Sequence, residues 1–308
     1  MWFLFETVAA LLLSAVPLGS AACTEKRQIV PWSTLTHEEK QAYVNADVCL
    51  TKLPSTSGFR GAVTRWDDLM WPHIYLTSVV HNCGAFLPWH RYFVLVHDRM
   101  IREECGYDGP FPYWYETEDI DDIAGSDLWN YYGHNGVGDD HCLGDGPFAN
   151  ITLRFTYNNT IGEYCLKRNW NQKVFNLTNQ AQIDACMQYQ NYTPAWRCWG
   201  FNPHGAGHQA VGGHMADPTY SPGDPKVDLP NRLEEMGGAN IAFTIINDPD
   251  NVEYPSPEIL STLGDNGNWT TLEHNLWMME IGDFAPNITI ADIMDVGGDV
   301  MCADYVDL

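Results

Sequence analysis

The pattern of apolar and polar positions along this chain predicts helices joined by long loops. Thr36 and Glu39 form a capping box before a mixed apolar and polar segment, so a helix is expected over residues 37–50. Ser256 and Pro257 are a typical helix start, with serine as the N-cap and proline in the first turn. Further helices are expected over residues 66–80, 89–104, 184–190, 203–212 and 257–263.

Residues 116–148 lack this periodicity. The segment is rich in Asp and Gly, which is typical of a long irregular loop. The expected fold class is therefore mainly α, with a central antiparallel helix bundle that carries the candidate histidines, long irregular loops and little β structure.

The first 22 residues have the layout of a cleaved secretory signal peptide. An apolar core at 8–18 is followed by small residues at 19–22. This run is too short and interrupted for a membrane span, and no other segment is a candidate for one. No Pro/Ser-rich linker or internal repeat divides residues 23–308, so a single domain is expected there.

Charge and cysteine content narrow the class of protein further. With 40 acidic and 16 basic residues, the surface should repel nucleic acid and anionic membranes. Nine cysteines behind a signal peptide indicate several disulfides with at least one cysteine left over. Nothing in the sequence indicates a protein partner. Asn-x-Thr sequons favour a secreted, extracellular glycoprotein, and they begin at Asn150, Asn158, Asn176, Asn191, Asn268 and Asn287.

Two histidine clusters carry the candidate chemistry. His73 is expected on one helix, His90 near the start of the next and His81 in the connection between them, so the three rings can reach one ion. His204 and His208 are four residues apart and project from the same face of a helix. Neutral imidazoles suit copper, so the clusters predict three ligands for one copper ion and two for a second.

The second cluster alone has other interpretations. A His-x3-His pair can be structural or can bind metal adventitiously, and a zinc protease signature would need Glu where this chain has Gly205. The first cluster makes copper the favoured interpretation. Five other histidines have no ligand-like spacing and are interpreted as surface or packing residues: His37, His97, His134, His141 and His274.

The sequence around both clusters resembles the type-3 copper proteins, particularly the short secreted fungal tyrosinases and catechol oxidases. The motifs are DDLMWPH and HNCGAFLPWHRYF in the first cluster and PHGAGHQAVGGHM in the second, and similar segments cover nearly all of residues 23–308. The resemblance implies two copper ions. Their ligands would be His73, His81 and His90 for the first ion, and His204 and His208 for the second.

The third ligand of the second copper is missing from the sequence. In the family it lies in a segment that begins Asp-Pro-x-Phe and contains a His-His pair, but here Pro225 is followed by Lys226, and family-like sequence resumes at Asp228. Because family-like sequence stops and resumes so abruptly, we favour a splice form or gene model that lacks one segment. The alternative is a real protein with an impaired second site. His214 and His274 match no family ligand position.

Smaller departures from the family concern the surroundings of the first copper. Asp98 stands where the family usually has Glu, and Pro72 should kink the helix of His73 or start a new turn. Some relatives link a cysteine two residues before the second histidine to its ring. That position is Val79 here, and Cys83 lies two residues after the histidine, so the thioether is not expected.

The resemblance implies an oxidase that converts a small phenolic substrate into an o-quinone with O2. Gly205 replaces an Asn that the family links to monophenol hydroxylation, so o-diphenols or o-aminophenols are the favoured substrates, and Gly205 and Met215 are candidates for the substrate pocket. One alternative is a catalytically impaired secreted glycoprotein that holds one copper or none. The other is an oxygen carrier, which the small domain disfavours.

Overall fold

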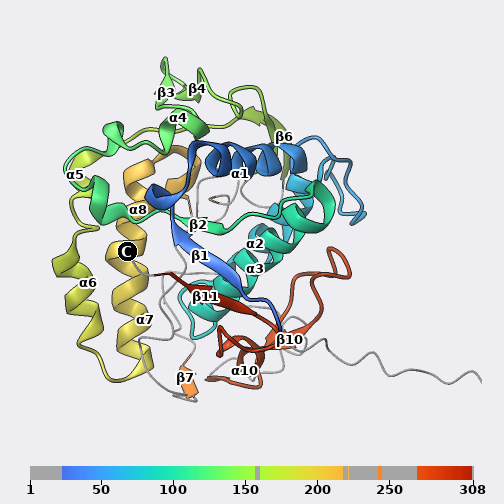
Figure 1. Ribbon diagram of the computed structural model, residues 1–308, viewed down its shortest axis with the longest axis vertical. Coiled ribbons are helices and arrows are strands. Elements are labelled where there is room, and N and C mark those ends of the chain that lie inside the picture. Colours follow the sequence, from blue (N-terminus) through green and yellow to red (C-terminus); the bar gives the residue numbers. More distant parts are fainter. Residues whose placement is uncertain (1–22, 157–159, 218–220, 222–241, 245–268, 307–308) are drawn as a thin grey trace, which may run out of the picture.

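The computed structural model describes residues 23–156, 160–217, 221, 242–244 and 269–306 (Figure 1). Helices predominate among them, which confirms the mainly α class. The longer helices are α1 (His37–Leu50), α2 (Arg65–Val80), α3 (Phe86–Cys105), α6 (Gln180–Met187), α7 (Tyr192–Phe201) and α8 (Pro203–Val211). Short α-helices are α4 (Trp129–Tyr132), α5 (Gln172–Phe175) and α10 (Ile290–Ile293), and short 3-10 helices are η1 (Trp32–Thr34), η2 (Glu116–Asp119), η3 (Ile123–Gly125) and η5 (Gly213–Ala216).

The β structure is confined to small sheets. In the described residues the largest sheet is parallel and three-stranded, with β1 (Arg27–Pro31) between β2 (Phe111–Tyr113) and β11 (Ala303–Tyr305), so early, middle and late segments of the chain meet there. The antiparallel pairs are β3 (Gly136–Val137) with β4 (Cys142–Leu143), β5 (Thr152–Thr156) with β6 (Thr160–Cys165), β7 (Ala242–Thr244) with β8 (Trp269–Thr271), and β9 (Asn275–Leu276) with β10 (Ile288–Thr289).

Helices α2 and α3 lie in the core, and local sequence sets their ends. Thr64 and Asp67 form a capping box that starts α2. Gly106 ends α3 with a φ of 69°, a left-handed conformation that glycine adopts without strain. The side chains of Trp89 and Tyr92 on α3 are fully buried. The hydrophobic core therefore surrounds the helix that carries His90.

Side chains of α3 donate hydrogen bonds to backbone carbonyl oxygens in the C-terminal part of the chain. Arg99 donates to the carbonyl oxygens of Phe284 and Val300, each at 2.9 Å. The indole of Trp89 donates to the carbonyl oxygen of Trp277 at 3.2 Å. These carbonyls belong to irregular segments, so α3 supplies hydrogen bonds that the segments do not make among themselves.

Four disulfides confirm the expectation of several bonds with one cysteine left over. They join Cys23 to Cys302, Cys49 to Cys105, Cys142 to Cys165 and Cys186 to Cys198. Cys83 takes part in none of them and is buried. No helix within the described ranges is long and apolar enough to cross a membrane.

The predicted helices agree with the structure to different degrees. The prediction over 37–50 is confirmed, and α2 and α8 differ from their predictions by one residue at one end. Helix α3 begins earlier than residue 89, and α6 lies several residues before the predicted 184–190. The prediction that 116–148 is wholly irregular was wrong, because the segment forms short helical turns and the β3–β4 pair. The signal peptide (1–22), the 225–226 junction and the helix expected at 257–263 lie outside the described residues.

Candidate metal centre

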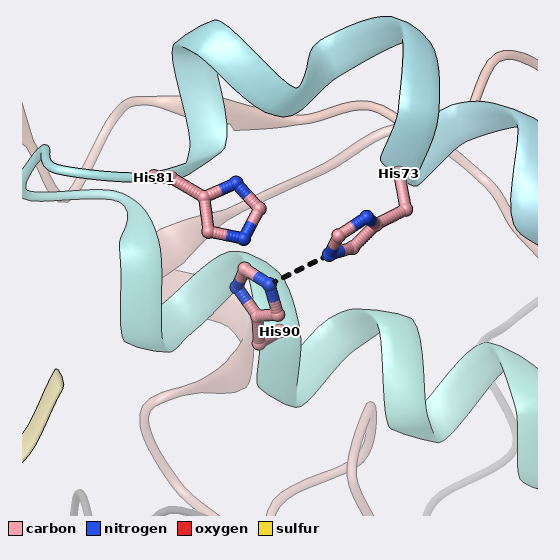
Figure 2. A group of neighbouring side chains, drawn as sticks. All are labelled: His73, His81 and His90. Atoms are coloured by element: carbon pink, nitrogen blue, oxygen red, sulfur yellow. Dashed lines mark hydrogen bonds between the residues drawn. The ribbon is translucent and has the colours of Figure 1, made fainter. Parts of the chain in front are cut away.

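Three of the predicted ligands come together where α2 leads into α3. His73 lies in the middle of α2, His81 is its C-cap residue and His90 lies in the second turn of α3. Figure 2 shows the three rings pointing into one space between the helices. One ligand atom of each residue lies within 4.8 Å of the others, and the Nε2 atoms of His73 and His90 are 3.2 Å apart. We call these residues the three-histidine group.

Backbone carbonyls orient two of the three rings. The Nδ1 atom of His81 lies 2.9 Å from the carbonyl oxygen of Thr77, and the Nδ1 atom of His90 lies 2.7 Å from that of Phe86. A carbonyl oxygen only accepts hydrogen bonds, so in each ring Nδ1 carries the proton and donates it. The lone pair is then on Nε2, where it can bind an ion. Each carbonyl belongs to the residue four positions earlier, so the helical repeat fixes the orientation.

Burial keeps the imidazoles of His81 and His90 neutral. It lowers the pKa of His81 to about 4. It also lowers the pKa of His90 well below its ordinary value, with a further contribution from the imidazoles of His81 and His73. Neutral imidazole is the metal-binding form, so protons compete weakly for these nitrogens at neutral pH.

The second predicted cluster forms a pair on α8. The rings of His204 and His208 are 4.4 Å apart between centroids, as expected for residues one helical turn apart. The Nδ1 atom of His208 lies 2.8 Å from the carbonyl oxygen of Met215, in the turn that follows the helix. The contact places the proton of His208 on Nδ1, so its lone pair is on Nε2. We call these two residues the histidine pair.

Phe86 contacts both sets of histidines. Its ring centroid lies 4.8 Å from that of His90 and 5.3 Å from that of His204. Phe86 is buried, and a side chain on Gly200 would approach its ring to 3.1 Å. The three-histidine group and the histidine pair are therefore neighbours in space, although more than a hundred residues separate them in the chain. No sequence pattern singles out Phe86, except that it lies four residues before His90.

No third ligand joins the histidine pair within the described residues. The three-histidine group is the one set there of three or more His, Cys, Asp or Glu close enough to hold an ion. The sequence has no histidine between residues 215 and 273. Nδ1 of His214 accepts from the backbone N–H of Lys167 at 2.9 Å, and its ring packs on Tyr164. His274 is buried and belongs to no such set. The donor set of the group thus fits copper, and within the described residues the pair has two histidines and no third donor.

The structure also shows what surrounds these histidines. Helix α2 continues through Pro72, so no new helix starts there, and a kink at this position stays a prediction. The carboxylate of Asp98 binds the guanidinium groups of Arg27 and Arg102. The thiol of Cys83 lies 3.1 Å from the carbonyl oxygen of Val79. The expectation that no thioether joins a cysteine to the second histidine stays a prediction.

Comparisons with known proteins agree with this arrangement. The sequence profile of the common central domain of tyrosinase matches residues 63–226. Tyrosinase ustQ of Aspergillus flavus is 27% identical over 296 residues, which cover 89% of this chain and 78% of that protein. N-acetyl-6-hydroxytryptophan oxidase ivoB of Emericella nidulans is 24% identical over 341 residues, which cover 89% and 90%. A solved structure of a mutant polyphenol oxidase from Thermothelomyces thermophila shares the fold, with a TM-score of 0.71, 23% identity, and coverage of 92% of this chain and 89% of that one.

Proposed function

This chain belongs to the tyrosinase family, and on that premise we propose that it is a copper-dependent oxidoreductase that oxidises o-diphenols or o-aminophenols to o-quinones with O2. With a diphenol, two substrate molecules each lose two electrons and two protons, and one O2 becomes two waters. Monophenol hydroxylation is the less favoured activity. The observation that carries the proposal is the convergence of three imidazoles beside a second pair.

In this proposal His73, His81 and His90 hold the first copper, and His204 and His208 hold the second. Nitrogen donors of neutral imidazoles suit copper. Bound copper would exchange electrons between the phenol and O2. The protein's own part is to keep the rings of His81 and His90 neutral by burial and to aim their nitrogens through backbone carbonyls.

Gly205 and Met215 are proposed to border the substrate. Gly205 follows His204, and a Cβ at this position would come within 2.9 Å of the carbonyl oxygen of Gly200. An Asn here would have to move the end of α7, so packing favours the glycine that the sequence has. The proposed preference for diphenols over monophenols rests on the absence of the Asn. Met215 is buried, and its backbone carbonyl accepts a hydrogen bond from His208, so this pocket candidate would also help to position that ligand.

We also propose that the protein is secreted and extracellular, as a single domain over 23–308 after removal of residues 1–22. Disulfides form and persist on the secretory route, and the four bonds described above support that route.

The function is tested by metal content and oxygen uptake on one preparation. The copper-loaded protein is expected to hold two copper ions and to consume O2 with catechol and 2-aminophenol, but much less with tyrosine. Two bound coppers without oxidation of either substrate would contradict the oxidase. Rapid catechol turnover would eliminate the oxygen carrier.

The second candidate function is an impaired glycoprotein with an incomplete second copper site. The observation that favours it is the lack of a third ligand at the histidine pair within the described residues. It predicts about one copper or none per chain and no oxidation. Sequencing the transcript across Pro225 and Lys226 separates the cases: an in-frame insert with a His-His pair supports the oxidase, and an uninterrupted junction supports the impaired protein.

A further inference from the structure

The flank formed by α5, α6 and α7 carries exposed apolar side chains that copper chemistry does not explain. Figure 1 shows these three helices on one side of the molecule. Leu177, just after α5, is 51% exposed, and Tyr189, just after α6, is 46% exposed. Single exposed apolar residues are ordinary. These two are distinguished by position, because each lies within two residues of the Asn of an Asn-x-Thr sequon.

The turn after α5 forces Leu177 outward. Phe175 and Thr178 are both buried, and the Thr178 hydroxyl donates to the carbonyl oxygen of Phe175 at 2.9 Å. The backbone N–H of Leu177 donates to the carbonyl oxygen of Val174, also at 2.9 Å. Since the residues on either side point into the core, Asn176 and Leu177 face solvent together.

Asn191 differs from the other asparagines that begin helices on this flank. Asn171 and Asn179 cap α5 and α6 with their side-chain oxygens, which accept from the backbone N–H groups of Val174 and Gln182. Neither of them begins a sequon. Asn191 occupies the N-cap position of α7, is exposed, and makes no side-chain capping bond. Asparagine is a favoured N-cap residue. Because the Asn191 side chain makes no capping hydrogen bond, its amide is available for modification.

We propose that Asn176 and Asn191 carry N-linked glycans that cover Leu177 and Tyr189. A glycan is bulky and polar, so beside an exposed apolar side chain it keeps other proteins from that side chain. In the transfer, the asparagine Nδ2 displaces the diphosphate of a lipid-diphosphate oligosaccharide at its anomeric carbon, and one N–H proton is released. The Cys186–Cys198 disulfide ties α6 to α7 and fixes the intervening turn.

The inference rests on the proposed secretion and not on the copper chemistry. The full chain, with residues 1–22, is expressed in a filamentous fungus and collected from the medium. Peptide N-glycosidase converts each glycan-bearing Asn to Asp, and we expect the resulting mass increase of about 1 Da at Asn176 and Asn191. If the secreted protein shows no mass increase at these two positions, the inference is overturned, and the proposed oxidase function is unaffected. Unmodified protein retained in the cell overturns both secretion and the inference.

A second measurement tests whether the glycans cover apolar surface. Native deglycosylation should raise the fluorescence of a bound hydrophobic dye by about twofold and increase self-association. The variant Leu177→Ser with Tyr189→Ser keeps both sequons and should show no such rise. Asn150→Gln removes an exposed sequon elsewhere and should leave dye binding unchanged. An equal rise in the wild type and the double variant overturns the covering role.

Discussion

The three-histidine group and the histidine pair both contact Phe86, but the chain builds them differently. The group comes from two long helices joined by a short connection, and all its ligands lie between His73 and His90. The pair comes from the single short helix α8 and is oriented by the turn that follows it. The group is complete within one local unit of structure. As the proposed second copper site, the pair finds no third ligand within the described residues.

This difference shows how a metal site becomes sensitive to the loss of a segment. A set of ligands within one helix-loop-helix unit forms whenever that unit folds. A ligand from a distant segment is lost with that segment, while the rest of the site keeps its geometry. The pair keeps its 4.4 Å spacing between ring centroids although no third ligand joins it in the described part of the chain.

The largest expected effect is a loss of copper affinity in the variant His90→Ala. It leaves two imidazoles in the group, so the affinity of this site for copper should fall by more than about 100-fold. Competition with a chelator, followed by elemental analysis of the protein, measures the loss. His134→Ala is the control, because His134 is an exposed ring paired with Asp145 and should not affect copper content. Tight copper retained by His90→Ala at this site would contradict the assignment.

His208→Ala should affect the pair alone. The group draws its ligands and their carbonyl partners from α2 and α3, so it should stay loaded. An isolated Cu(II) ion gives an electron paramagnetic resonance signal, whereas two coupled ions do not, so the variant should show the signal of one isolated ion. Copper lost from both sites would mean that the two regions do not load independently.

A moderate effect is expected from pH on the copper-free protein. The ordinary pKa of histidine is near 6.5, and burial lowers that of His81 to about 4. The unfolded chain therefore takes up the proton first as the pH falls. The contribution of His81 to the free energy of unfolding should be fully present above about pH 6.5. It should decrease by roughly 3 kcal/mol as the pH falls toward 4. Urea unfolding over this range measures it, and His81→Gln should flatten the curve. A curve unchanged in that variant would show that His81 is not the source.

The smallest effect is expected from Phe86→Leu. The change keeps an apolar side chain of smaller volume, so the free energy of unfolding should fall by about 1 kcal/mol. Both His90 and His204 lose the ring against which they pack, but His90 keeps its hydrogen bond to the backbone carbonyl of residue 86. The group should therefore keep more of its copper affinity than the pair. Separate titrations of the two sites measure this. Equal losses at both sites would contradict the distinction drawn here.

Local signals explain which parts of the fold could be predicted from the sequence. The start of α1 was predictable because Thr36 and Glu39 form a capping box within four residues. The start of α3 and the whole of α7 were missed, and both contain an early proline, Pro88 or Pro194. Proline in the first turn costs no helical hydrogen bond, because the first N–H groups of a helix have no partner within it.

The candidate site was likewise predictable where its residues are close in the sequence. Ligand spacing placed His73, His81 and His90 on one helix hairpin, and the structure brings them together. The contacts of Phe86 with both regions depend on how α8 packs beside α3, which no local pattern encodes. The pairing of Cys23 with Cys302 is likewise a long-range fact, since 279 positions separate the two residues.

That disulfide gives the molecule the topology of a ring. Between Cys23 and Cys302 the backbone forms a closed covalent loop, and the other three disulfides lie inside it. A single cut by a protease anywhere in this loop opens the ring but releases no fragment. The three-histidine group and the histidine pair would stay on one covalent molecule after such a cut, and they would separate only if the cystine were also reduced.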